Sequence, residues 1–325
     1  MLSRFILAAL IASAIGIKAE AATLNTNLWV DGVVGAAADS TKNSKIEFEF
    51  RDSETGGIAH HFHVMHAKPM HLIVVSEDLS HFAHVHPEVR PHSAKAFYIT
   101  ANSQTADPDN FALSTLLPFG GKYFLFAEVM PMGYGMLNFP YDLNVSGPTR
   151  SAVAPATDMP GADGKIVKYF SADDSPSDET GGEYLIKLEV LPMEHCQVII
   201  PRLHFEVLAK INGAFEQVKD LDQWLESYGH AILIGRDGKT AAEKAVLHLH
   251  AVWPLPTGDP SKDERGPRLE LATHSHGKSM QSDNYRAWIQ LKHKGKVHTF
   301  SFEFDWKLEE ARKNAIHSPE LCLEG

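Results

Sequence analysis

The chain has 325 residues, with 30 basic and 41 acidic side chains, which gives a formal net charge of −11 at pH 7. This acidic balance disfavours nucleic acid as a partner, because phosphate binding requires concentrated lysine and arginine. After the first 21 residues no stretch has the length and apolar character of a membrane span, so we expect no stable membrane insertion. A chain of this length usually forms two domains.

The N-terminus has the pattern of a secretory signal peptide. A basic start at Arg4 is followed by an apolar stretch from Phe5 to Ile17 and by the small residues Ala19 and Ala21. We predict cleavage after Ala21 and release into the periplasm or outside the cell. The mature chain would keep 28 basic and 40 acidic residues, a net charge of −12, because residues 1–21 contain Arg4, Lys18 and Glu20.

The segment from His60 to Pro87 contains eight of the nineteen histidines of the chain. Its uninterrupted apolar run, Leu72 to Val75, predicts a buried strand. The residues from Glu77 to Ser80 predict a turn, and the following six residues, which begin at His81, predict the returning strand. The segment is therefore expected to form an antiparallel hairpin that carries several histidines.

The register of this hairpin decides which histidines meet. If Ser76 faces His81, then His71 lies opposite His86 and shares a face with His84. Directly opposed Cβ atoms lie about 4.5 to 5.5 Å apart, which suits imidazoles that converge on one ion. A slip of one residue would move His86 to the other face. The alternative interpretation is that these histidines form ordinary structural hydrogen bonds.

The chain contains an internal repeat. The nine residues that begin at Met70 align without gaps on the nine that begin at Gly229, which places His71 over His230. Each copy is followed by a His-x-His motif and a proline. The histidines of these motifs are His84 and His86 in the first copy and His248 and His250 in the second. Pairing outward from the second turn places His230 opposite His250.

The repeat continues downstream, where residues 123–128 correspond to residues 285–290. Ten residues after the start of each segment stands a glycine at an expected hairpin tip, Gly133 or Gly295. Met136 and His298 follow three residues later, and both are possible metal ligands.

Period-two patterns separated by turn signals predict an all-β protein made of two tandem antiparallel sandwiches of the immunoglobulin-like or cupredoxin-like kind. Short helices are expected at Leu221 to Tyr228 and at Lys307 to Ala315. The predicted organisation is a signal peptide at 1–21, a first sandwich at 22–147, a linker at 148–165, a second sandwich at 166–306 and a C-terminal helical tail at 307–325.

The pattern HAKPMHLIVVSEDLSHFAHVHP resembles bacterial exported β-sandwich domains of the YtkA-like, heavy-metal-associated kind, and the second copy resembles them more loosely. Such domains are often found beside copper-resistance and heavy-metal efflux systems. The resemblance implies metal association and a metal efflux or other envelope protein as a partner. The matching positions are His66, His71, His84 and His86 in the first copy, and His230, His248 and His250 in the second.

Copper is the metal that the residue types favour, with zinc as the alternative. Imidazole suits copper, zinc and nickel, whereas thioethers select copper(I). The first repeat places Met70 beside His71, and Met130, Met132 and Met136 near the expected hairpin tip. Core filling is the competing explanation for these methionines. Mixed histidine and methionine ligands in an oxidising compartment favour copper buffering, delivery or resistance.

Two other classes of function compete with metal carriage, an enzyme or redox protein and a protein-interaction module. A blue-copper carrier needs a cysteine close to histidine and methionine ligands, but Cys196 lacks that spacing and is a better disulfide partner for Cys322. No hydrolase elbow, zinc-protease motif or phosphate loop is present, so we expect no enzyme, although three histidines with an open position could also serve a hydrolase. The main alternative is a protein-interaction module with structural or pH-sensing histidines.

Overall fold

The computed structural model describes residues 24–59, 61–90, 93, 95–100, 116–151, 157–171, 183–195, 197–257, 259, 261–273 and 280–317. In this part of the chain, mostly antiparallel strands form the fold, and the short helix α1 (Leu308–Asn314) follows the last long strand. The expected all-β fold with a short C-terminal helix is confirmed. The predicted cleavage site, Cys196 and Cys322 lie outside the described residues, so the cleavage and the disulfide stay predictions.

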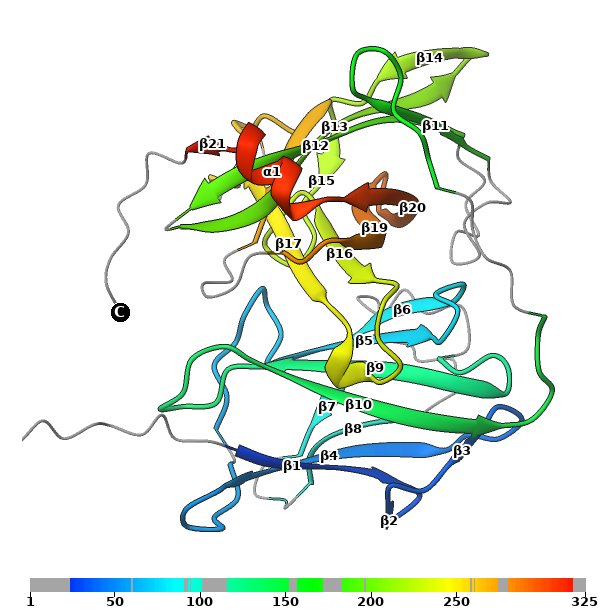
Figure 1. Ribbon diagram of the computed structural model, residues 1–325, viewed down its shortest axis with the longest axis vertical. Helices are drawn as coiled ribbons and strands as arrows, with labels where there is room; N and C mark the ends of the chain where they lie inside the picture. The colour runs from blue at the N-terminus through cyan, green and yellow to red at the C-terminus, as the bar shows by residue number, and fades with distance from the viewer. Residues whose placement is uncertain are drawn as a thin grey trace, which may run out of the picture.

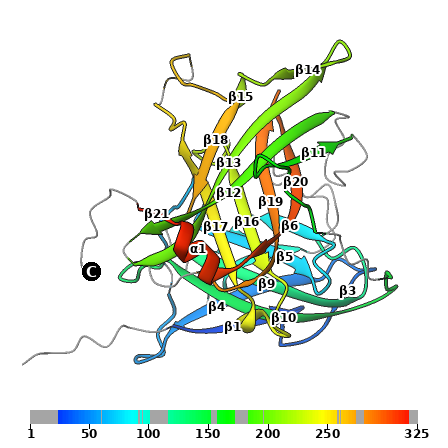
Figure 2. The ribbon, with the colours of Figure 1, turned by 45° about the horizontal axis from the view of Figure 1, so that its top comes forward.

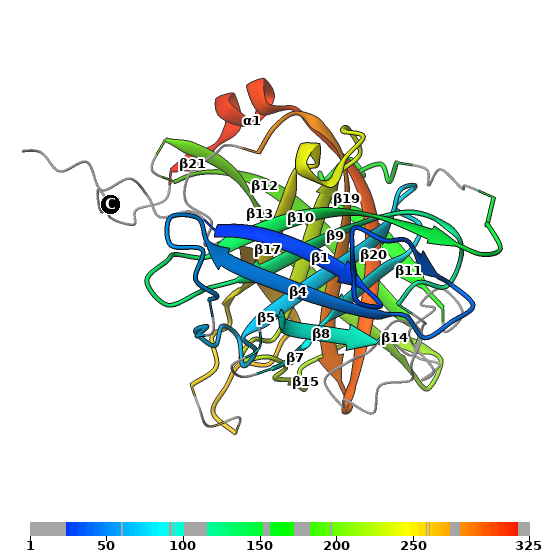
Figure 3. The same ribbon diagram turned by 90° about the horizontal axis from the view of Figure 1, so that it is seen from below.

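The first repeat is a sandwich of two five-stranded sheets, which occupies the lower half of Figure 1. Ile46, Phe48 and Phe50 alternate along one strand and are fully buried between the sheets. Figure 3 shows the outer sheet from below. The outer sheet, in spatial order, is β2 (Val33–Val34), β1 (Leu24–Val30), β4 (Lys45–Asp52), β8 (Lys95–Thr100) and β7 (Glu88–Val89). The inner sheet is β3 (Ala38–Asp39), β10 (Leu137–Ser146), β9 (Gly121–Val129), β5 (Met70–Ser76) and β6 (Phe82–Val85).

The second repeat is one strongly curled sheet around its own core. The two edges of this sheet lie close together. Lys168, in the edge strand of residues 166–170, donates a hydrogen bond of 2.9 Å to the carbonyl of Ser301, in the edge strand of residues 296–306. The main path is β11 (Ile166–Phe170), β12 (Tyr184–His195), β13 (Val198–Ile211), β18 (Arg268–Ala272), β17 (Val246–Trp253), β16 (His230–Gly235), β19 (Asp283–His293) and β15 (Leu221–Asp222). The remaining elements are β14 (Ala214–Gln217), β20 (Lys296–Trp306), β21 (Ile316–His317) and the 3₁₀ helix η1 (Ala241–Glu243).

The expected hairpin tips at Gly133 and Gly295 are confirmed. Gly295 has a φ of +76°, and Lys294 before it has a φ of +53°, so the two residues form the turn between β19 and β20. Positive φ at both central positions gives the turn a twist that matches the strands, and glycine takes this conformation without a steric penalty.

The helix predicted at Leu221 to Tyr228 is wrong. Leu221 belongs to β15, and the following chain makes a tight turn in which Trp224 and Ser227 exchange backbone hydrogen bonds of 2.8 and 3.1 Å. Trp224 and Leu225 are buried in a small cluster with Val297. This tertiary burial outweighs a weak local helix preference. The helix predicted in the tail is confirmed as α1.

Strands β5 and β16 are buried on both faces, which explains their uninterrupted apolar runs. In β5, Leu72 and Val74 face the core of the first repeat. Ile73 and Val75 instead join a shared cluster with residues of the second repeat. Figure 2 shows β16, β17 and β19 descending onto the sheet that holds β5, β6 and β9. The shared cluster consists of Ile73, Val75, Leu79, Phe124, Phe126, Ile232, Ile234, Ala241 and Trp288, with Phe82 and Val246 at its edge.

Candidate metal centre

Two groups of three histidines lie on equivalent hairpins of the two repeats. Within each group one nitrogen atom per residue lies within 4.8 Å of those of the other two, so each group could hold a metal ion. The pairing of His230 with His250 is confirmed, and the pairing of Leu72 with Val85 places His71 against His86 as expected. The first triad is His71, His84 and His86, and the second triad is His230, His248 and His250.

All six triad histidines are buried. Burial lowers the pKa of His84 to about 3, with a further contribution from the neighbouring His248. Burial also lowers the pKa of His71, His86, His230 and His250 well below the ordinary value, and nearby histidines add to the shift. Neutral imidazole is the form that binds a metal, so proton competition at these five rings is weak at neutral pH.

The hydrogen bonds of the first triad direct two lone pairs at each other. Nε2–H of His71 donates to the carbonyl of Met65 at 3.0 Å, and Nδ1–H of His84 donates to Oε1 of Gln290 at 3.0 Å. Each neutral ring then has an unprotonated nitrogen, and these two nitrogens, Nδ1 of His71 and Nε2 of His84, lie 3.1 Å apart. A shared proton would require an imidazolium, which burial opposes. A cation held between the two nitrogens would remove this repulsion.

The second triad has the same arrangement. Nε2–H of His230 donates to the carbonyl of Trp224 at 3.1 Å, and Nδ1–H of His248 donates to Glu128 at 2.6 Å. The other nitrogens, Nδ1 of His230 and Nε2 of His248, are buried and have no hydrogen-bond partner. In both triads, outer groups fix the tautomer and leave the inner nitrogens available to a metal.

The carbonyls that orient His71 and His230 belong to matching strained turns. His66 and Ala67 have φ of +45° and +63°, and Leu225 and Glu226 have φ of +50° and +60°. None of the four is glycine, so each residue costs about 1 kcal/mol or more in this conformation. The same costly turn six residues before the equivalent histidine in both repeats points to a functional constraint on the carbonyl position.

The two triads face each other across the contact between the repeats. The ring centroids of His71 and His84 lie 5.6 and 5.2 Å from that of His248. His66 stacks on His250 with centroids 3.6 Å apart, so the expected site residue His66 lies beside the second triad as well as beside His71. We refer to the two triads and His66 together as the histidine cluster.

The other predicted ligands do not join the triads in the structure. Met70 is fully buried in the core of the first sandwich, since alternation along β5 sends it to the face opposite His71. Met130, Met132 and Met136 lie at the β9–β10 connection, where Met132 and Met136 are exposed. His298 packs against His293 and Tyr184.

Sequence reasoning missed Glu128 and Gln290, which hold His248 and His84. These residues occupy the last aligned positions of the downstream repeat segments, 123–128 and 285–290. Burial raises the pKa of Glu128, but its interactions with His248, and more weakly with His71 and His66, outweigh that effect, so the net pKa lies below the ordinary value and the group stays a carboxylate. Their matched positions were the available signal, and the function of that match required the tertiary contact.

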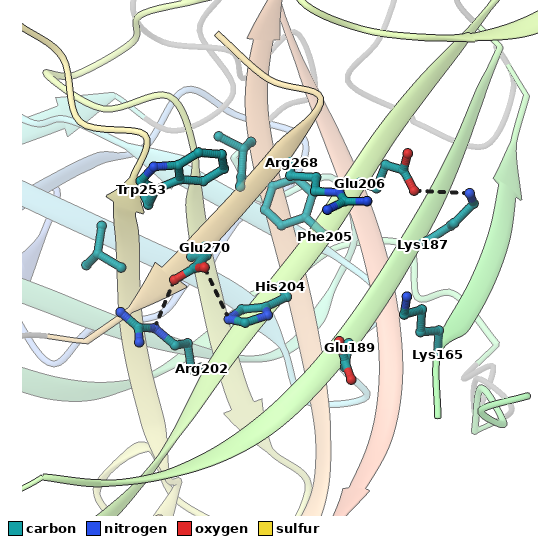
Figure 4. Close-up of a pocket in the computed structure, with 12 residues that line it drawn as sticks. Lys165, Lys187, Glu189, Arg202, His204, Phe205, Glu206, Trp253, Arg268 and Glu270 are labelled. Atoms are coloured by element: carbon teal, nitrogen blue, oxygen red, sulfur yellow. Dashed lines mark hydrogen bonds and ion pairs between the residues drawn. The ribbon is translucent and has the colours of Figure 1, made fainter. Parts of the chain in front are cut away.

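A separate groove of about 610 Å³ lies on the outer face of β12, β13 and β18. Figure 4 shows that several of its charged side chains pair with one another. Glu270 contacts Arg202 at 3.4 Å and His204 at 3.6 Å, and Lys187 contacts Glu206 at 3.0 Å. The lining shares no residue with the histidine cluster. Its internal ion pairs leave the cluster as the stronger candidate site.

His81 should make the metal-free protein less stable in acid. Burial lowers its pKa to about 4, and its Nε2–H donates to the carbonyl of Leu116 at 3.0 Å. The unfolded chain binds this proton below about pH 6.5 and the folded chain does not, so stability is complete above that pH and falls toward pH 4, by about 3 kcal/mol. Urea unfolding of His81→Gln should show a pH profile flatter by that amount. An unchanged profile would contradict this, and the exposed His63→Gln is the control.

Comparisons with known proteins identify one family. The model of the family described as Domain of unknown function (DUF8832) matches residues 30–147 and 201–307, more than half of the chain. The two matched segments contain the two hairpins and their triads, in agreement with an internal repeat. A search of curated proteins finds no match.

Proposed function

Because the chain belongs to the DUF8832 family, we propose its function from its own residues: it is an exported, non-enzymatic protein that binds a transition metal, copper first and zinc second. Its role would be to buffer the metal, to deliver it or to confer resistance. The observation that carries this proposal is the 3.1 Å approach of Nδ1 of His71 to Nε2 of His84. The outer hydrogen bonds of both rings already use their N–H groups.

The preference for copper rests on ligand chemistry. Imidazole nitrogens bind copper and zinc, and among the divalent ions of the first row copper(II) binds such sites most tightly. The methionine loop supplies a second argument. Met132 and Met136 are 59% and 48% exposed, and the backbone of His61 and His63 pairs with that of Met132 and Met130. Exposed thioethers on a loop whose backbone pairs with a histidine-bearing segment favour copper(I) at the surface. The resemblance of the first hairpin to heavy-metal-associated exported domains supports the same proposal.

Metal content is the direct test. The purified chain, exposed to copper or zinc and then desalted, should retain at least one ion when measured by mass spectrometry. The variant His86→Ala/His250→Ala removes one ligand from each triad, and we expect it to lose nearly all of this metal. The control variant His61→Ala/His63→Ala changes exposed histidines outside the triads and should keep it.

Two results would count against the proposal. One is a wild-type chain that stays empty after exposure to both metals, and the other is a triad variant that retains as much metal as the wild type. Near-ultraviolet circular dichroism would show whether the variant is folded. In either case the cluster would be structural, and a protein-interaction role would take its place.

A further inference from the structure

Each triad contains a histidine whose orientation depends on a side chain from the other repeat. His84 of the first repeat is held by Gln290 of the second, and His248 of the second is held by Glu128 of the first. The donor and the acceptor of these two hydrogen bonds are 206 and 120 residues apart in the sequence. Each triad is therefore correctly oriented only when the repeats are docked, and an isolated repeat lacks one support.

The reciprocal supports are equivalent in position but not in charge. Glu128 and Gln290 occupy the same place on β9 and β19, and His71 and His230 pair with them in the sheets. Glu128 places a carboxylate in direct hydrogen-bond contact with His248 of the second triad, whereas Gln290 gives His84 of the first triad a neutral partner. The charge of Glu128 reaches the first triad only through space, at His71. A carboxylate partner makes an imidazole ligand more basic and offsets the charge of a bound cation. The second triad is thus the better electrostatic environment for a divalent ion.

A second difference between the repeats also favours the second triad as the tighter metal site. The position of His66 in the first repeat is taken by Leu225 in the second, since both are the first residue of the matching strained turns. The ring of His66 stacks on the ring of His250, with centroids 3.6 Å apart. The centroid of His66 lies 6.1 Å from that of His230. An extra imidazole therefore borders the second triad, and the corresponding residue of the second repeat cannot do the same for the first.

We propose that the histidine cluster is a single centre for two transition-metal ions held between the repeats, and that the ions are unequal. The ion at His230, His248 and His250, which Glu128 supports, is bound more tightly and retained. The ion at His71, His84 and His86, which Gln290 supports, is bound more weakly and exchanges. The inference rests on the proposed metal-binding function and adds the stoichiometry, the order of filling and the residue that sets it.

Titration calorimetry with Zn²⁺ on the full chain tests the proposal, because zinc avoids redox side reactions. We expect two binding steps. Glu128→Gln keeps the side-chain shape and the hydrogen bond but removes the charge, and it should weaken the tighter step by about 10- to 100-fold. Gln290→Glu should strengthen the weaker step. The exposed Glu77→Gln is the matched control and should leave both steps unchanged.

Single-triad variants assign the steps. His250→Ala should remove the tighter step and His86→Ala the weaker one, and the swap Glu128→Gln/Gln290→Glu should reverse the order. If only one ion binds at saturation, or if Glu128→Gln leaves both affinities unchanged, the proposal of two unequal ions is overturned while the metal-binding function stands. If no heat and no bound zinc or copper are detected, both proposals fail.

Discussion

Saturation with copper or zinc should raise the thermal unfolding midpoint of the metal-free protein by on the order of 10 °C. A ligand that binds only the folded state at 100 times its dissociation constant stabilises it by about 2.7 kcal/mol per site. Each kcal/mol shifts the midpoint by about 2 to 4 °C for domains of this size. The six buried histidines give the folded chain a site that the unfolded chain lacks.

Differential scanning calorimetry measures this effect on protein stripped with a chelator and then reloaded. The variant His86→Ala/His250→Ala should lose the shift, and the exposed His63→Ala should keep it. A wild-type midpoint that does not respond to either metal would contradict the prediction. So would an equal rise in the triad variant, because that rise would come from metal bound elsewhere.

Phe126→Ala should reduce the free energy of unfolding by about 3 to 5 kcal/mol and should also weaken metal binding. Truncation of a buried phenylalanine removes apolar contact and leaves a cavity. Phe126 is 2% exposed and belongs to the apolar cluster shared by the repeats, where Phe82 stacks on Trp288 with centroids 4.7 Å apart. Loss of this contact loosens the docking on which Gln290 and Glu128 depend.

Leu125→Ala is the matched comparison for this variant. Leu125 precedes Phe126 on β9 and is also buried, but it faces the core of the first sandwich. Urea unfolding should show a large loss for both variants, whereas zinc titration should show the larger loss of affinity for Phe126→Ala. Equal affinities would indicate that docking of the repeats does not control the site. Val33→Ala, at an exposed position, should change stability by no more than about 0.5 kcal/mol.

Local sequence patterns were sufficient to predict the register of both hairpins. The four-residue connection and the period-two alternation placed His71 against His86, and alignment of the repeats placed His230 against His250, as the pairing shows. Side chains alternate strictly along a strand, so a correct register fixes which histidines share a face. The same rule places Met70 away from His71, although its neighbouring position had suggested a common site.

Weak local preference misled where burial decided the backbone. The segment from Leu221 to Tyr228 has residues that tolerate a helix, but Trp224 and Leu225 are buried against Val297, and the chain turns sharply between them and Ser227. Intrinsic helix preferences amount to less than about 1 kcal/mol per residue for ordinary residues. The burial of one large side chain exceeds that amount.

The sequence by itself determined the two hairpins and the members of each triad, because turn length and alternation act over a few residues. The tertiary structure alone decided that the triads meet, that Glu128 and Gln290 hold histidines of the opposite repeat, and that His66 reaches His250. These contacts join residues more than 100 positions apart. They depend on the docking of two apolar sheet faces, and no local period records which face meets which.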